Sequence, residues 1–499
     1  MAVYIIGIGG SGAKCIEAVI QLTAVGLFSE ESVESIKPLF VDADETNGNL
    51  EQARSSLSIY KKCNDLMAGG DTQQSAWMKT KIESFDLWSP FGSDNLHKDL
   101  KAFFNYNTLR QNEPKLANLF DVLYTNDERE VNLDVGFRGR PSLGAAVMSK
   151  VDLEQLDQEP WGSLLQQIQG DVSGGSSPKV FLCGSIFGGT GAAGLPTIGR
   201  LIANKLKKLN LRDRVKIGCL FLLPYFGFSP TPGTDPEGVY ARSENFLLNT
   251  EAALRYYVTQ AQETFDTVYL LGNRNLSRVE FSVGKNTQRN QPHFIELYAG
   301  LAARQFVLTT PPDKGRVVLI SREKIGRLTW NDLPDKEQVQ QALVNATRFA
   351  YAWLAEIVPE LEAAKDMGVN RFGRLAPWLT KFYNSRGNSL PDFNDSEQQD
   401  GIRVISNWCR DYLRWLRAIH QCEGDTIELF RTNAFANLDG KLKGEDLSTL
   451  LVNDNRDRSK KSEDRPRMLK ERLNPKYITP PNQGTVGLAK AVYLSCKLK

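Results

Sequence analysis

Residues 181–196 read FLCGSIFGGTGAAGLP. The apolar run at 180–182 predicts a buried strand, and a helical pattern follows the glycines. The glycines allow the backbone to approach a bound phosphate closely, and Thr190 adds a hydroxyl. A helix beginning near Ala192 would point its positive end at the same place. The segment therefore predicts a phosphate-binding strand–loop–helix, with a tight turn between strand and helix as the plain alternative.

A second glycine loop lies near the start of the sequence. Residues 3–6 form an apolar run, residues 7–12 read GIGGSG, and a helical pattern follows. This GxGxxG spacing suits a pyrophosphate held by backbone N–H groups, as in an NAD or FAD site, where Asp42 could bind the ribose. A P-loop is less favoured, because Lys14 comes one position late and Cys15 stands where Ser or Thr binds magnesium.

Strands and helices alternate along the first 300 residues. Further strands are expected at 38–41, 216–223 and 267–271. The alternation predicts an α/β fold with a mostly parallel, Rossmann-like sheet and helices on both faces. Both glycine loops then lie beyond the carboxyl ends of strands, where ligands of such sheets bind.

These segments, taken in order, resemble the nucleotide loops of the tubulin/FtsZ superfamily. Residues 181–196 resemble the GGGTGTG signature and its surroundings in the bacterial division protein FtsZ, and residues 7–14 resemble the first loop. The other correspondences are the second loop at Asp42 and Asp44, the third at 136–144, the fifth at 223–228, the strand leading to the sixth at 266–273, and the start of the central helix at 290–297. The resemblance covers about residues 1–300 and is closest to divergent prokaryotic tubulin-like proteins.

The sequence also departs from the FtsZ pattern. Phe187 replaces the first glycine of the signature, Ala193 replaces its last, and Lys14 replaces an asparagine. Arg138 and Arg140 add cations to the third loop, where they could contact the γ-phosphate or form surface salt bridges. The phosphate geometry is therefore expected to differ from that of FtsZ.

The resemblance implies a site for GTP or GDP with Mg²⁺. Asn273 and Asn290 are expected to hold the base, and the glycine loops and acidic residues to hold the phosphates. The expected nucleotide-binding residues are Gly9, Gly10, Ser11, Gly12, Lys14, Asp42, Asp44, Arg138, Gly139, Arg140, Gly188, Gly189, Thr190, Gly191, Ala192, Asn273 and Asn290.

The resemblance also implies a domain order. Residues 1–285 are expected to form the nucleotide-binding domain, with a helical insertion at about 60–130, and residues 286–310 the central helix. Amphipathic patterns at 339–358 and 402–420 predict a mainly α C-terminal domain over 311–499, which could bind protein partners.

Hydrolysis in this superfamily uses a residue that a neighbouring subunit supplies after its central helix. The nearest candidate here is Asp332, within LTWNDLPD at 328–335. A carboxylate suits the positioning of water and metal, but the same residues are also an ordinary helix-capping sequence.

The amino-acid composition narrows the possible partners, metal sites and cellular location of the protein. With 61 Lys and Arg against 59 Asp and Glu, the net charge of +2 predicts no general attraction to nucleic acid or membranes. Seven scattered cysteines without a CxxC pair argue against disulfides and zinc, and with no signal peptide or membrane span the expected location is the cytoplasm.

Three functions stay open. They are a GTPase that assembles head to tail into a homo-oligomer or filament, a non-catalytic GTP-binding scaffold of a multi-protein bacterial system, and an NAD- or FAD-dependent oxidoreductase.

Overall fold

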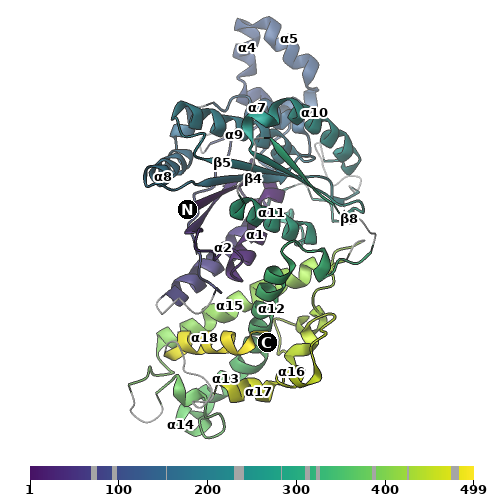
Figure 1. Cartoon of the computed structure of the whole chain (residues 1–499). Coiled ribbons are helices and arrows are strands. Elements are labelled where there is room, and N and C mark those ends of the chain that lie inside the picture. The colour runs from purple at the N-terminus through teal and green to yellow at the C-terminus, as the bar shows by residue number, and fades with distance from the viewer. Residues whose placement is uncertain are drawn as a thin grey trace.

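The first two thirds of the chain form a seven-stranded parallel sheet with helices on both faces (Figure 1). The computed structural model describes residues 1–68, 76–92, 98–152, 154–229, 241–282, 284–309, 315–321, 326–384, 389–423, 426–473 and 483–498. The strand order is β3-β2-β1-β4-β5-β7-β9. The expected mostly parallel α/β fold is confirmed.

The strands are continuous apolar runs because both faces of the sheet are covered. Their bounds are β1 Ala2–Ile8, β2 Ser35–Val41, β3 Lys81–Ile82, β4 Lys179–Ser185, β5 Lys216–Leu222, β7 Thr267–Leu271 and β9 Arg316–Ile320. Every residue of β1 and β4 is buried. The order of the strands reverses between β1 and β4, which is the position where open α/β sheets bind ligands.

Two apolar cores lie on opposite faces of the sheet. One face packs against α1 Gly9–Ala24, α2 Gly48–Ala68 and α11 Phe294–Leu308. The other packs against α7 Pro141–Met148, α8 Trp161–Ser173, α9 Gly189–Lys208 and α10 Phe246–Thr264. On this second side, the short helices α3 Leu100–Phe103, α4 Tyr106–Asn112, α5 Pro114–Leu123 and α6 Asn126–Glu130 form a projection that includes the top of Figure 1.

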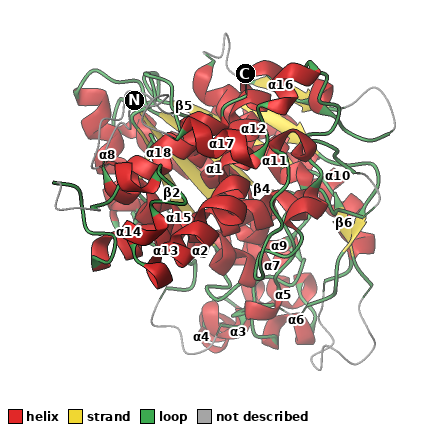
Figure 2. Ribbon diagram, turned by 90° about the horizontal axis from the view of Figure 1, so that it is seen from below, coloured by secondary structure: helices red, strands yellow, loops and turns green. Residues whose placement is uncertain are grey.

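The C-terminal third is helical, as predicted, and shares the core of the first face. Its longer helices are α12 Lys336–Ala352, α13 Val358–Met367, α15 Ser396–Ile419 and α18 Gly484–Cys496; α14 Val369–Phe372, α16 Arg458–Ser462 and α17 Pro466–Arg472 are short. Seen from below, these helices lie in front of the sheet (Figure 2). None of the described helices combines the length and apolarity needed to cross a bilayer.

Two strands differ from the expected domain boundaries. β3 lies within the helical insertion expected at 60–130, yet it pairs with β2 and forms one edge of the sheet. β9 lies after the boundary expected at 311, yet it pairs with β7 and forms the other edge. The apolar residues of β9 are exposed or half-buried, because an edge strand is covered less completely.

Candidate functional site

Two helix N-termini meet at the carboxyl edge of the two central strands. α1 begins at Gly9, directly after β1, and α9 begins at Gly189, shortly after β4. Gly9 has φ +74°, and a Cβ there would lie 3.3 Å from the backbone nitrogen of Gly191. Neither helix has a side-chain cap or an acidic residue in its first turn. Their first N–H groups therefore suit an anion.

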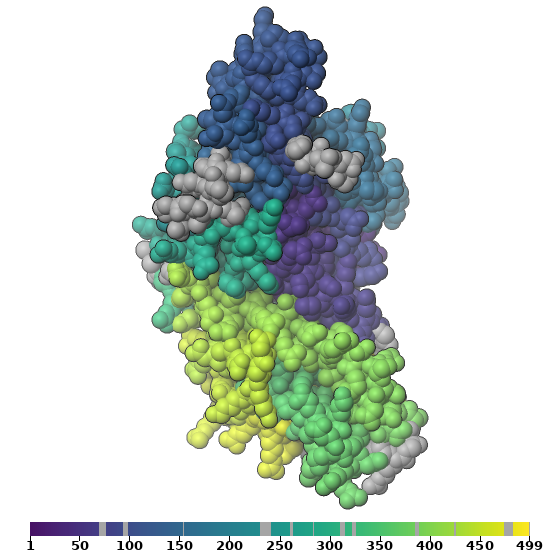
Figure 3. Space-filling view, turned by 180° about the vertical axis from the view of Figure 1, so that it is seen from behind, coloured from purple at the N-terminus to yellow at the C-terminus, as the bar shows by residue number. Residues whose placement is uncertain are grey.

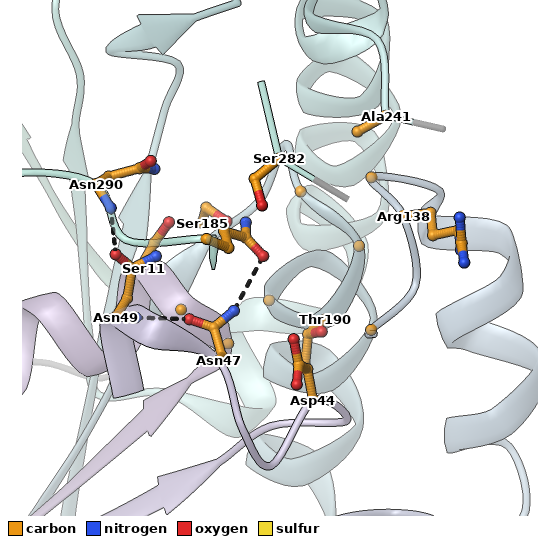
Figure 4. Close-up of a pocket in the computed structure, with 18 of the residues that line it drawn as sticks. Ser11, Asp44, Asn47, Asn49, Arg138, Ser185, Thr190, Ala241, Ser282 and Asn290 are labelled. Atoms are coloured by element: carbon orange, nitrogen blue, oxygen red, sulfur yellow. Dashed lines mark hydrogen bonds between the residues drawn. The ribbon is translucent and has the colours of Figure 1, made fainter. Parts of the chain in front are cut away.

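The loops enclose one side of a pocket with an empty volume of about 1050 Å³ (Figure 4). The sequence-predicted residues that line the pocket are Gly9, Gly10, Ser11, Lys14, Asp42, Asp44, Arg138, Gly139, Gly188, Gly189, Thr190, Gly191 and Asn290.

Four sequence-predicted residues lie outside the pocket lining: Gly12, Arg140, Ala192 and Asn273. Gly12 allows α1 to approach β4, since a Cβ there would lie 2.6 Å from the carbonyl oxygen of Cys183. Arg140 forms an ion pair with Glu128 on α6. Of the two roles considered for Arg140, a contact with the γ-phosphate and a salt bridge, its side chain forms the salt bridge.

Asp42 is a buried carboxylate at the floor of the pocket. Its Oδ1 accepts hydrogen bonds from the Thr190 hydroxyl at 3.3 Å and from the Asp44 backbone at 3.2 Å. Its Oδ2 is buried and, among the described residues, has no hydrogen-bond partner. Burial first, and then the charge of Asp44, raise the pKa of Asp42 to about 7. An unpartnered carboxylate oxygen of this kind suits a cation or a bound hydroxyl.

Asp44 ties the loop after β2 to a segment far along the chain. Its Oδ1 accepts from the backbone and the hydroxyl of Thr46, and its Oδ2 accepts from the Lys285 backbone at 2.6 Å. Burial raises the pKa of Asp44 above its ordinary value. Asp44 therefore positions the wall of the pocket as well as adding charge to it.

Four amide side chains line another wall of the pocket. Asn47 Nδ2 donates to Gln288 Oε1 at 3.0 Å, and Asn47 Oδ1 accepts from the Asn49 backbone at 2.9 Å. Asn49 Oδ1 accepts from the Asn290 backbone at 2.8 Å (Figure 4). Only Asn290 was predicted from the sequence. Tertiary contacts bring the missed residues together, and the local signal for them was the pair Asn47 and Asn49 shortly after β2.

A wall of aromatic rings forms a further side of the pocket. Phe187 and Phe246 have ring centroids 4.8 Å apart, and Phe228 lies 5.7 Å from both Phe246 and Phe281. These rings give the pocket an apolar surface beside its polar loops. Phe187, the departure from the glycine of FtsZ, therefore packs with this wall.

Lys14 lines the pocket, but its charge is paired. Its Nζ lies 2.5 Å from Glu296 Oε1 and donates to the Gln291 carbonyl at 2.9 Å. The Tyr225 hydroxyl also donates to Glu296 Oε1, at 2.9 Å. All of these side chains are buried or nearly so. Lys14 thus joins α1 to the central helix α11 and is already neutralised by a carboxylate.

Asn273 and Asp332 lie together in a different cavity, which is lined by α11 and by the ends of β5, β7 and β9. The structure therefore brings Asn290 to the pocket and leaves Asn273 outside it. Asp332 Oδ2 accepts from the backbone and the hydroxyl of Thr329, at 2.6 and 2.9 Å. This is the capping arrangement that the sequence allowed, and a catalytic role for Asp332 stays a prediction.

Comparisons with known proteins give likenesses in structure alone. No family model matches the chain, and no curated protein matches it. A GTPγS-bound protofilament of CetZ2 from Haloferax volcanii is 15% identical, with a TM-score of 0.28 and a match over 62% of this chain. CetZ from Methanosaeta thermophila is 14% identical over 62% (TM-score 0.25), and the GDP-bound monomer of CetZ1 from Haloferax volcanii is 13% identical over 55% (TM-score 0.25).

All three are tubulin/FtsZ-like proteins, the kind predicted from the sequence. The matches span 61%, 53% and 51% of those chains.

Proposed function

We propose that this protein binds a guanine nucleotide with Mg²⁺ in the pocket between the two glycine loops. The observation that carries the proposal is the meeting of two uncapped helix N-termini beside the buried, unpartnered oxygen of Asp42. The resemblance of the sequence loops to those of the tubulin/FtsZ superfamily supports guanine as the base.

The phosphates would lie against the N-termini of α1 and α9. The cationic side chains among the described lining residues are Lys14 and Arg138, and Lys14 is paired with Glu296. Backbone N–H groups and helix dipoles would therefore supply most of the attraction for phosphate. In this proposal backbone groups bind the phosphates, and no lysine takes the place of the P-loop lysine.

The acidic residues fit a magnesium ion that is shared with the nucleotide. Among the described residues, no three His, Cys, Asp or Glu side chains form a group that could hold a metal alone. Mg²⁺ at nucleotide sites commonly uses one or two carboxylates together with phosphate oxygens and waters. Asp42 Oδ2 would hold the ion, which would neutralise phosphate charge when bound.

The amide cluster supports recognition of a base by hydrogen bonds. Asn47, Asn49, Gln288 and Asn290 present both donors and acceptors, as the edge of guanine requires. A dinucleotide-dependent oxidoreductase is less well supported, because the second glycine loop, Gly188 to Gly191, lines the same pocket and a GxGxxG dinucleotide site does not require it.

We further propose that hydrolysis, where it occurs, depends on self-assembly. A non-catalytic GTP-binding scaffold is the second candidate, and the engagement of the Asp332 carboxylate by Thr329 in a capping box favours it. Asp332 caps η5 Trp330–Asp332 and lines a cavity other than the nucleotide pocket. A water-positioning residue would therefore have to come from another subunit or from another part of the chain.

The first test is chemical identification of the bound nucleotide. We expect chromatography of the heat-denatured, purified protein to release GTP or GDP. Phosphate release per subunit that rises with protein concentration would support assembly-coupled hydrolysis, whereas bound nucleotide without turnover would support the scaffold. Recovery of a nicotinamide or flavin cofactor in place of a guanine nucleotide would contradict the proposal.

Thr190→Val tests the loop while conserving side-chain shape. The variant removes the hydroxyl that donates to Asp42, so we expect GTP affinity to fall by roughly 10-fold. Isothermal titration calorimetry with GTP and Mg²⁺ measures the change. Thr197→Val is the matched control, because its hydroxyl bonds within α9 to the Ala193 carbonyl. Equal GTP affinity in the two variants would show that the Thr190 hydroxyl does not contribute to nucleotide binding.

A further inference from the structure

A second cavity, here called the α11 groove, lies beyond the carboxyl ends of β5, β7 and β9, between α10 and α11. It has an empty volume of about 2010 Å³. Its floor includes Ile295 and Tyr298 of α11, and its sides include Leu247, Leu276 and Leu319, which are 69%, 45% and 65% exposed. Large exposed apolar surfaces of this kind mark interaction sites in soluble proteins.

The α4–α5 projection carries a second exposed apolar surface. Leu116, Leu119 and Leu123 follow the i, i+3, i+7 spacing of one helix stripe and are 46%, 51% and 59% exposed; Val122 beside them is 82% exposed. Ala117 and Phe120, on the adjacent flank of the same apolar face of α5, pack inward. α5 is therefore an amphipathic helix whose outward stripe is apolar, the pattern of a helix that binds in a groove.

The two surfaces cannot meet within one molecule. α5 stands at the top of the molecule, on the α7, α9 and α10 side, whereas α11 lies below the sheet (Figure 1). From behind, the space-filling view shows the projection standing clear of the rest of the chain (Figure 3). An α5 helix that fills the groove must therefore come from a second copy.

We propose that α5 of one copy binds in the α11 groove of the next copy. The stripe from Leu116 to Leu123 is about 10 Å long, at 1.5 Å per helical residue, and its three leucines would replace water on the leucines of the groove. The inference extends the self-assembly part of the proposed function, but both surfaces lie outside the nucleotide pocket.

Charges at the two surfaces are complementary. Exposed Glu113 and Lys115 lie at the N-terminal end of α5. Exposed Arg274 and Asp332 lie on the lining of the groove. One acid and one base on each side allow two opposite-charge pairs across the contact, which would set the direction of the helix in the groove.

The contact is heterologous, because it joins two different surfaces. A pair of copies then keeps one unused α5 and one unused groove, so the contact generates a ring or an open filament instead of a closed dimer. This property allows the inference to be tested by mixing variants.

The test is sedimentation velocity of the full chain over a range of concentrations, with and without GTP and Mg²⁺. We expect the unmodified protein to form oligomers that grow with concentration, and both Leu119→Glu and Leu319→Glu to be monomers. An equimolar mixture of these two variants should form dimers and stop there, because one intact α5 meets one intact groove. Leu375→Glu is the control, since Leu375 is 72% exposed in the helical domain, and it should assemble normally.

Three results would overturn the inference: an unmodified protein that stays monomeric, single variants that assemble as well as the control, or a mixture that stays monomeric. Circular dichroism of each variant checks that it is folded. GTP binding measured on the same samples separates the two proposals. Retained GTP binding without assembly defeats this inference alone, and assembly without GTP binding defeats the proposed nucleotide function alone.

Discussion

At the scale of single residues, the most unusual environment is that of Glu17, one turn beyond the first glycine loop. Its Oε1 accepts from Gln52 and Ser56 on α2, at 3.2 and 3.3 Å. Burial first, and then the charge of Asp411 on α15, raise the pKa of Glu17 from 4.5 to about 8; Glu296 also raises it and Lys14 lowers it. The folded protein therefore holds a proton that the unfolded chain releases between these pH values.

This raised pKa predicts the sign of a pH dependence. The free energy of unfolding should fall as the pH rises from about 4.5 to 8, because ionised Glu17 is disfavoured only in the folded state. Glu17→Gln keeps an oxygen that accepts from Gln52 and Ser56, but it cannot ionise. At pH 9 its free energy of unfolding should therefore exceed that of the unmodified protein by on the order of 2 kcal/mol. Urea denaturation from pH 5 to 9 measures this, with exposed Glu51→Gln as the control. Parallel pH profiles for the two variants would contradict the assignment.

At the scale of elements, the central helix α11 is held at both ends by residues from distant parts of the chain. At its start, His293 and Glu296 form a capping box and Glu296 pairs with Lys14. At its end, Lys179 Nζ donates to the carbonyls of Phe306, Val307 and Thr309 at 3.0, 2.8 and 2.5 Å. A cation bonded to the last carbonyls of a helix stabilises it.

Lys179→Met tests this helix end. The substitution leaves three carbonyls without their shared donor, so the free energy of unfolding should fall by about 2–3 kcal/mol. Lys216→Met is the matched control, because Lys216 lies opposite Lys179 in the register of β5 and is only half-buried. Urea denaturation compares the two variants. An equal decrease in the free energy of unfolding would show that the hydrogen bonds from Lys179 to α11 do not stabilise the protein.

At the scale of the whole molecule, the sheet domain and the helical domain share a core. The apolar cluster beneath the sheet runs from α1 and α11 into α12, α15 and α18. A buried hydrogen bond of 2.7 Å joins Gln21 on α1 to Asp411 on α15. The helix that begins at the first glycine loop is therefore packed directly against the C-terminal domain.

We expect thermal unfolding to be a single transition that nucleotide shifts as a whole. At a GTP concentration of 100 times Kd, the stabilisation should be about 2.7 kcal/mol. Calorimetry measures the number of transitions and the shift that GTP causes in each. Two separate transitions, of which GTP moves only the first, would show that the domains are independent.

Local patterns in the sequence by themselves determined the central strands, the two glycine loops and the long helices of the second domain. Runs of buried residues and the 3.6-residue period are properties of neighbouring residues, so they can be read without knowing the fold. The same reasoning placed Thr190 and Asp42 beyond the ends of strands, and they do line one pocket.

Only the tertiary structure decided which polar groups meet. Asn47 and Gln288 are 241 positions apart, and Lys14 and Gln291 are 277 apart, so no local pattern could join the amide cluster or show that Lys14 is neutralised by Glu296. Packing also places Asn273 in the α11 groove instead of the nucleotide pocket predicted from the sequence, and it places β3 and β9 at the edges of the sheet. Such contacts depend on how whole elements pack, because their energy comes from burial and from partners that only the folded chain supplies.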